Sequence, residues 1–310
     1  MLLGQSQAIE AFRAARASGR LHHGWLLAGP EGVGKRRFAD MAALALLAEA
    51  EWEVPPEHPA ARLVTARSHL DHFVLRPPEE GKGASTATIG IEQVRALRQF
   101  LHGTAALGRC RTVIVDPVDA LNISSANALL KELEEPGQDT TLFLVSHAPG
   151  RLLPTIRSRC RTLGFGRLDA SDMAAVLATI APDLGEDVRD RLIALSEGAP
   201  GRAARLLEEG ALEIVAELDA LTTSDATLAL ARRFQPAAAA PGFALLCQLV
   251  PARIAGLARA ACDHRLADLH AEVSALAARA VAQAFDRVQV AHMLLSRWQE
   301  ARRLAGATAA

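Results

Sequence analysis

The first half of the chain predicts an α/β fold with a parallel sheet, and the second half predicts helices alone. Short apolar runs alternate with helical patterns up to residue 165, which is typical of a parallel sheet covered by helices. Beyond that point no convincing strand pattern occurs. Tyrosine is absent and aromatic residues make up 4% of the chain, a composition that favours helix. A chain of 310 residues is also too long for one ordinary core, so two or three domains are expected.

Five strands are expected in the first half, each a short apolar run bounded by turn or charged residues. The runs are GWLLAG (24–29), HFVLR (72–76), RTVIVD (111–116), TLFLVS (141–146) and, more weakly, RTLGF (161–165). The Pro-rich interval 51–67 is expected to be an irregular excursion between the first two strands.

Helical patterns fill the intervals between these strands. One begins at Lys35, a second covers 91–101 and a third covers 124–135. In the third, apolar residues recur on one helix face: Ala126, Leu129, Leu130 and Leu133. Pro136 follows this helix, as expected at a helix end.

The change of pattern near residue 166 predicts three domains. We expect a phosphate-loop α/β domain at 1–165, a small helical domain at 166–210 and a helical domain at 211–310. The last clear amphipathic helix near the C-terminus has an apolar side made by Val288, Ala291, Leu294, Leu295 and Trp298.

Composition excludes several classes of protein. The formal net charge of −1 gives no global basic field for nucleic acid, although a local patch could lie within a balanced total. The four cysteines are scattered and predict neither disulfides nor a thiolate metal site. The paired His69 and His72 lack a third ligand nearby, so no metal is expected. With no signal sequence and no membrane span recognised, we expect a cytoplasmic protein.

The sequence LLAGPEGVGKRRF is nearly a phosphate-binding loop. Gly29, Gly34 and Lys35 match the pattern G-x-x-x-x-G-K-[ST], between an apolar strand and a helix. Gly32 and Gly34 would let backbone N–H groups curl around a phosphate. The final position holds Arg36 instead of the hydroxyl residue that normally binds Mg²⁺. We therefore expect a phosphate cradle in which magnesium is disfavoured.

The stretch TVIVDPVDAL has the Walker B pattern, an apolar strand that ends in an acid. Asp116 occupies the position that acts on the metal, but Pro117 stands where a glutamate would activate water. Pro117 favours a turn before Asp119, so Asp119 is not expected to be a general base. Both Arg36 and Pro117 are therefore unsuited to hydrolysis.

An arginine-rich segment, RLLPTIRSRCRTLGF, ends the first domain. It contains Arg151, Arg157, Arg159 and Arg161. One interpretation is a solvated charged surface. The other is an arginine that contacts a neighbouring protein's nucleotide, where its permanent charge and rigid fork stabilise phosphate oxygens.

Together, LLAGPEGVGK, VIVDPVDALNISSANALLKELEEP and TLFLVSHAPGRLLPTIRSRC resemble the AAA+ clamp-loader subunits of bacterial DNA polymerase III. EGAPGRAARLL (197–207) resembles the segment that opens the third lid helix of the same family. The likeness covers about residues 4–207. It implies an AAA+ domain, a helical lid and a helical collar that joins five subunits in a ring. Such a ring uses ATP at subunit interfaces to place a sliding clamp on primed DNA.

The resemblance is greatest to the members that do not hydrolyse ATP themselves. It implies that Ser158, Arg159 and Cys160 form the motif given to a neighbouring gamma or tau ATPase subunit, in a heteropentamer that also contains delta. No cofactor is required, and weak ATP or ADP binding without Mg²⁺ stays open. No zinc is expected, because the interval 45–72 lacks the four cysteines that many relatives carry there. Arg202 lies one residue late for a nucleotide-contacting lid arginine.

Two alternatives stay open at this point. The chain could be a competent ATPase subunit resembling gamma, which would need Mg²⁺ and water activation without the usual residues at 36 and 117. It could also be a phosphate-loop protein outside replication, such as a repair or recombination factor.

Overall fold

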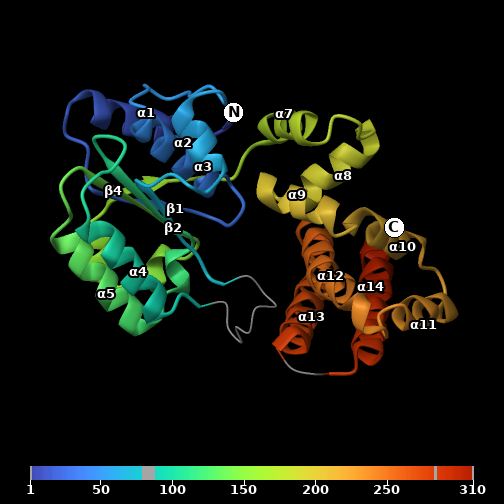
Figure 1. Cartoon of the computed structure of the whole chain (residues 1–310). Helices are drawn as coiled ribbons and strands as arrows, with labels where there is room; N and C mark the ends of the chain where they lie inside the picture. The colour runs from blue at the N-terminus through green and yellow to red at the C-terminus, as the bar shows by residue number, and fades with distance from the viewer. Residues whose placement is uncertain (1, 79–87, 283–284, 309–310) are drawn as a thin grey trace. The chain divides into compact units, whose positions relative to one another are not determined.

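The computed structural model describes residues 2–78, 88–282 and 285–308 (Figure 1). The chain divides into two compact units, each described by itself. The N-terminal unit comprises Met1–Thr179 and Glu197–Gly201, and the C-terminal unit comprises Ile180–Ser196 and Arg202–Ala310. The finer division into a lid at 166–210 and a collar at 211–310 stays a prediction.

A parallel five-stranded sheet forms the centre of the N-terminal unit, as the sequence predicts. Its strands are β1 (Gly24–Ala28), β2 (His72–Leu75), β3 (Arg111–Val115), β4 (Thr140–Ser146) and β5 (Arg161–Gly164). The strand order is β2-β3-β4-β1-β5, and every neighbouring pair is parallel. The carboxyl ends of all five strands therefore lie at one edge of the sheet.

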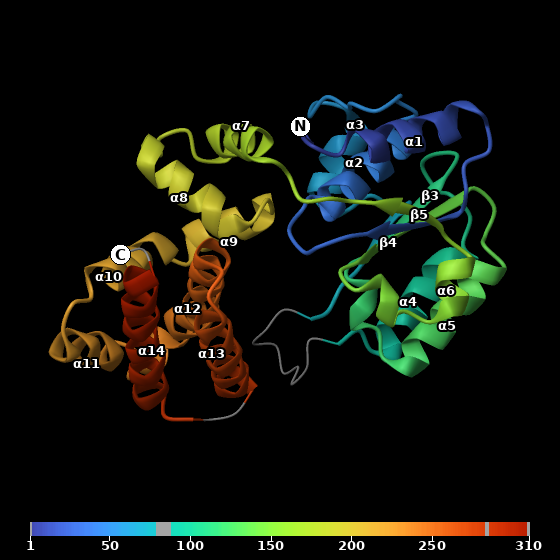
Figure 2. The same ribbon diagram turned by 180° about the vertical axis from the view of Figure 1, so that it is seen from behind.

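Helices cover both faces of this sheet (Figures 1 and 2). On one face lie α1 (Ser6–Ala17) and α2 (Lys35–Leu47), and on the other lie α4 (Ile91–His102) and α5 (Ile123–Glu134). Successive strand residues point to opposite faces. Trp25 accordingly packs with the core around α1 and α2, whereas Leu26 joins the core around α4 and α5.

The expectation of an irregular excursion at 51–67 is wrong in part, because this interval contains the short helix α3 (Pro59–Thr65). Pro59 occupies the first turn, where its missing N–H leaves no helical hydrogen bond unmade. His58 precedes it and accepts a hydrogen bond from the backbone N–H of Ala60 through Nδ1. Histidine is not among the usual capping residues, so the start of this helix gave little signal.

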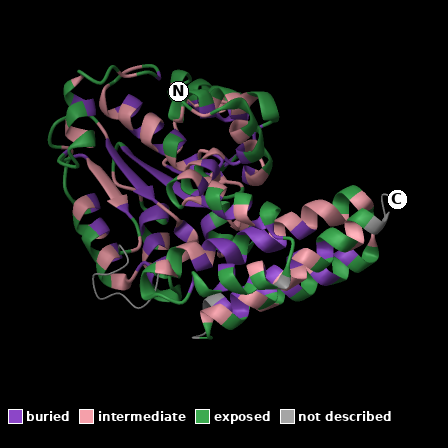
Figure 3. Ribbon diagram, turned by 90° about the vertical axis from the view of Figure 1, so that its right-hand side faces the viewer, coloured by how far each residue is buried: buried purple, intermediate pink, exposed green. Residues whose placement is uncertain are grey.

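Helices account for the regular structure described after residue 165. They are α7 (Ala170–Ile180), α8 (Glu186–Ser196), α9 (Pro200–Glu208), α10 (Ala211–Ala220), α11 (Ser224–Arg232), α12 (Ala240–Ala261), α13 (His264–Ala282) and α14 (Arg287–Thr308). Buried residues follow one side of many of these helices (Figure 3). In α14, Leu294 and Leu295 are fully buried, and Trp298 donates from Nε1 to the carbonyl of Leu218 at 3.0 Å.

One helical stretch among the described residues, Ala237–Ala261, is long and apolar enough to cross a membrane by length and composition alone. Core helices of other folds meet the same criterion. Here Leu245, Leu246 and Leu249 are completely buried in the C-terminal unit. Their burial matches a core helix within a helical bundle.

His72 in β2 provides a pH test of the fold. Its Nδ1 lies 2.8 Å from Thr112 Oγ1, and burial, with smaller effects from Arg36 and His69, lowers its pKa from 6.5 to about 4. The unfolded chain therefore takes up this proton first, so the free energy of unfolding falls as pH drops from 6.5 towards 4. Between about pH 7 and about pH 5 the wild type should lose about 1–2 kcal/mol more than His72→Gln. Urea unfolding of both proteins at each pH measures the difference, and equal losses would contradict a neutral, half-buried His72.

Candidate nucleotide site and arginine segment

The phosphate loop joins β1 to α2 at the carboxyl edge of the sheet. Three of its glycines have positive φ angles, 156° at Gly29, 79° at Gly32 and 103° at Gly34. A Cβ atom at Gly29 would lie 2.1 Å from the carbonyl oxygen of Phe165, a contact that the backbone could not accept. The loop therefore has the conformation that its glycines predict, and it packs directly on the end of β5.

Lys35 is directed back into its own loop. Only 2% of it is exposed, and Nζ donates to the carbonyls of Gly29, at 2.6 Å, and Pro30. Burial lowers its pKa to about 8, against the opposing effects of Asp116, Asp119 and Glu31. Lys35 thus stays largely protonated at neutral pH, and backbone carbonyls satisfy its ammonium group where a nucleotide phosphate would otherwise do so.

Arg36 and Asp116 are 80 residues apart in sequence and form an ion pair, with Arg36 Nη1 3.2 Å from Asp116 Oδ2. Arg36 also donates from Nε to Asp40 Oδ1 at 2.9 Å. One guanidinium therefore binds the Walker B carboxylate and a second acid on its own helix. A metal ion at Asp116 would have to displace a cation that the chain itself provides.

Asp119 has a structural role next to this pair. Its carboxylate accepts hydrogen bonds from Ser146 Oγ at 2.9 Å and from the backbone N–H groups of His147 at 2.7 Å and Ala148 at 3.1 Å. These bonds fix the turn that follows β4. A carboxylate engaged in this way is poorly placed to take a proton from water, consistent with the interpretation of Asp119 from the sequence.

His147 is a residue near the loop that sequence reasoning missed. It directly follows β4, whose last residue, Ser146, is in register with Ala28 at the end of β1. Burial and the charge of Lys35 lower its pKa, and its buried Nδ1 has no hydrogen-bond partner among the described residues. The signal was available, because the residue after β4 must lie beside the phosphate loop if β4 pairs with β1.

The start of α9 also contacts the loop. The backbone N–H of Gly201 donates to the carbonyl of Gly32 at 2.8 Å, and a Cβ atom at Gly201 would lie 3.0 Å from the Cα of Gly32. Gln5, near the N-terminus, also contacts the loop, donating from Nε2 to the carbonyl of Val33 at 3.3 Å. Arg202 belongs to the C-terminal unit, and its role stays open.

Arg159 lies at the opposite edge of the sheet from the phosphate loop. It ends the short helix α6 (Pro154–Ser158) and precedes β5, and its carbonyl approaches Gly24 at the start of β1. The loop follows the last residue of β1, about 13 Å further along the strand at ~3.3 Å per residue. In this chain Arg159 therefore does not face the chain's own phosphate loop.

The guanidinium of Arg159 is partly exposed and held by neighbours in its own chain. Nη2 lies 2.8 Å from Glu134 Oε1 at the end of α5, and Nη1 donates to the carbonyl of Thr155 at 3.3 Å. Cys160 is partly buried and packs against the core around α4 and α5, and burial raises its thiol pKa to about 12. Ser158 donates to the carbonyl of Thr155. The motif thus consists of an accessible arginine on an anchored turn.

The other arginines of the segment are dispersed. Arg151 and Arg157 are exposed, and the guanidinium of Arg161 lies 5.3 Å from the ring centre of Trp25. No cluster of three or more potential metal ligands occurs among the residues that the structure describes. His69 accepts a backbone hydrogen bond from Asp71.

Comparison with known proteins gives consistent matches to replication proteins. A family model described as "DNA polymerase III, delta subunit" matches residues 4–169. The chain is 42% identical over 193 residues to DNA polymerase III subunit delta' of Pseudomonas aeruginosa, covering 62% of this chain and 57% of the relative. It is 33% identical over 205 residues to subunit delta' of Escherichia coli, covering 64% and 58%. The chain therefore matches less than two thirds of the length of these relatives.

A solved structure has the same fold over most of the chain. It is a DNA polymerase III gamma subunit-related protein from Thermotoga maritima, with a TM-score of 0.54 and 18% identity, covering 96% of this chain and 100% of that one. At this identity the likeness shows the fold alone. The gamma subunit of Buchnera aphidicola is 28% identical over 211 residues, covering 67% of this chain and 56% of the relative.

The Arg36–Asp116 ion pair leads to a prediction about magnesium. Arg36→Thr removes the internal cation and restores the hydroxyl that normally binds the metal. We expect millimolar Mg²⁺ to leave the nucleotide-dependent shift in melting temperature of the wild type unchanged, and to increase that of Arg36→Thr. Arg37→Thr, one position along the same helix, controls for loss of charge. A Mg²⁺-dependent shift in the wild type would contradict the prediction.

Proposed function

Because the chain belongs to the DNA polymerase III delta-subunit family, we propose that it is a non-hydrolysing clamp-loader subunit that supplies Arg159 to a neighbouring ATPase subunit. The observation that carries this proposal is the ion pair between Arg36 and Asp116. Asp116 is the acid that would otherwise act on Mg²⁺, and here an arginine of the chain itself is bound to it. A subunit that does not bind Mg²⁺ would contribute to an ATP-driven ring by acting on the site of a neighbouring subunit.

The placement of Arg159 supports action across an interface. The guanidinium lies at the sheet edge opposite the phosphate loop, and its side chain is 35% exposed. Its cis partner Glu134 is also exposed, and exposed ion pairs contribute about 0–1 kcal/mol, so a phosphate could displace it. An arginine that stabilises developing phosphate charge in trans raises turnover by about 10³–10⁵.

Under this proposal the partners are gamma or tau subunits and delta in a heteropentamer, with the sliding clamp and primed DNA as the targets of the complex. The protein would work in the cytoplasm. It would need no metal or zinc of its own, and any ATP or ADP would bind weakly and without Mg²⁺. Similarity to the relatives named DNA polymerase III subunits favours this set of partners.

A gamma-like motor is the second candidate. The retained Gly29, Gly34 and Lys35 and the likeness to the Buchnera gamma subunit favour it. Against it stand Pro117, which has no proton-accepting side chain, and Asp119, whose carboxylate already accepts three hydrogen bonds.

Nucleotide turnover by the isolated chain separates these candidates. ATP binding and hydrolysis are followed together, with and without Mg²⁺. We expect no ATP hydrolysis, and ATP binding that is absent or unaffected by Mg²⁺, because Asp116 is already paired with Arg36 and not with a metal ion. Mg²⁺-dependent turnover that is lost in Lys35→Ala would establish the motor instead.

Arg159→Ala tests the trans role in a reconstituted complex. Hydrolysis at the site that receives this arginine should fall by about 10³-fold or more, because a finger contributes that much to phosphoryl transfer. Single-turnover measurement isolates that site from the others in the ring. Arg157→Ala, an exposed neighbour on the same short helix, is the matched control. Undiminished hydrolysis in Arg159→Ala complexes of normal composition would refute the role.

A further inference from the structure

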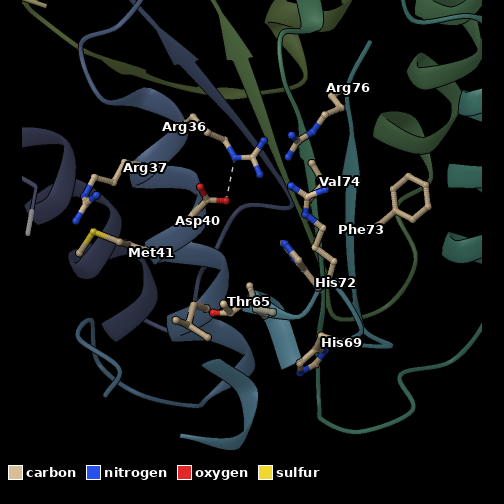
Figure 4. A pocket seen from close by; sticks show the side chains of 13 residues that line it. Arg36, Arg37, Asp40, Met41, Thr65, His69, His72, Phe73, Val74 and Arg76 are labelled. Atoms are coloured by element: carbon tan, nitrogen blue, oxygen red, sulfur yellow. Dashed lines mark hydrogen bonds and ion pairs between the residues drawn. The ribbon is translucent and has the colours of Figure 1, made fainter. Parts of the chain in front are cut away.

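A cavity of about 770 Å³ opens in the N-terminal unit between α2, α3 and β2 (Figure 4). Its volume is within the range typical of small-molecule sites. It shares Arg36 and Asp40 with the site described above, whereas its other lining residues have no part in the proposed clamp-loading role. The charged and imidazole groups that line it include Arg36, Asp40, Arg67, His69, His72 and Arg76.

The cavity has an excess of positive charge. Among the described residues that line it, four are arginines and one, Asp40, is acidic. Figure 4 shows the side chains of Arg36 and Arg76 directed towards one another near Asp40, while Arg37 points away from them. Both Arg36 and Arg76 act on the carboxylate of Asp40 electrostatically. Two guanidinium groups that face one another repel unless anions offset their charge. Asp40 and Asp116 are both paired with Arg36, so a phosphate would chiefly add a counter-charge for Arg76.

The histidines contribute hydrogen-bonding groups to the cavity and no charge at neutral pH. Burial lowers the pKa of both His69 and His72, and the nearby charge of Arg36 lowers that of His72 further. The positive charge that would attract an anion into the cavity therefore comes from the arginines, which stay protonated throughout the physiological pH range. Guanidinium groups suit phosphate in particular, because two parallel N–H donors match two phosphate oxygens.

Apart from Thr65, the remaining lining residues are apolar. Met41 and Leu44 on α2, Val64 on α3 and Val74 on β2 line it. A cavity with arginines at one side and aliphatic groups at another suits a ligand with a multiply charged phosphate end and room for an uncharged portion. Among the described residues no cluster of three or more potential metal ligands occurs at the cavity.

We propose that this cavity is a metal-independent binding site for a di- or triphosphate group, presented either as inorganic polyphosphate or as part of a nucleotide. The site is distinct from the phosphate loop, and Arg36 connects the two. A phosphate bound between Arg36 and Arg76 would compete with Asp40 and Asp116 for the Arg36 guanidinium. The inference does not rest on the action of Arg159.

Calorimetric titration of the full chain with pyrophosphate and with ADP, at low ionic strength and without divalent cations, tests the proposal. We expect saturable binding that Arg76→Gln weakens about tenfold, since charge-assisted bonds to phosphate are among the strong ones. Arg67→Gln is a second cavity variant. Arg62→Gln, an exposed arginine on α3 that does not line the cavity, should bind within about twofold of wild type.

The outcomes are distinct. Equal affinity for the two ligands identifies the polyphosphate anion as the group recognised, and tighter ADP binding assigns the apolar wall to the nucleoside; both support the site. The absence of saturable binding would overturn it. So would weakening by Lys35→Ala but not by Arg76→Gln or Arg67→Gln, which would place the ligand in the phosphate loop. Equal weakening by Arg62→Gln would reduce the effect to non-specific attraction. Thermal melting of each variant confirms that it is folded.

Discussion

Leu26 in β1 is in register with Leu144 in β4 on one side and Thr162 in β5 on the other, and all three strands run in the same direction. This shared direction determines where each chemistry-bearing segment lies. Loops that follow strands collect at one edge of the sheet, and segments that precede strands collect at the other. Asp116 therefore meets the phosphate loop, whereas Arg159 is carried to the far edge. An arginine placed there acts on a phosphate only if another molecule presents it.

At the carboxyl edge the Walker B acid, Asp116, is paired with a cation of the chain itself. Arg36 satisfies Asp116 with a single charge that cannot dissociate, and its planar donors also engage Asp40. A guanidinium offers hydrogen bonds but no Lewis acidity and no exchangeable water, so it can hold carboxylates together without polarising a phosphate. Lys35, bound to its own loop, completes an arrangement that is electrostatically satisfied without nucleotide.

Much of the fold and part of the site could be predicted from the sequence. The five strands have local apolar patterns, and the mismatches at Arg36 and Pro117 are visible because the surrounding motif fixes what each position should hold. The pairing of Arg36 with Asp116, the contact of Arg159 with Glu134 and the placement of His147 depend on which strands are neighbours. The cavity beside β2 depends on α3, whose capping residue is a histidine in place of the usual Ser, Thr, Asp or Asn. Local patterns contain no information about such distant contacts.

The packing of Gly29 has a consequence for how such a loop changes during evolution. Any side chain there would collide with the Phe165 carbonyl, and a side chain at Gly201 would press on Gly32, whether or not a nucleotide is ever bound. Selection for folding alone would therefore keep these glycines, whether or not the loop takes part in catalysis. Arg36, by contrast, contacts Asp40 and Asp116 through its charged side chain, so the residue at this position bears on the electrostatics of the site. In a loop of this kind the glycine spacing reflects descent and packing. The residue after the lysine indicates more directly whether the loop can bind a metal ion.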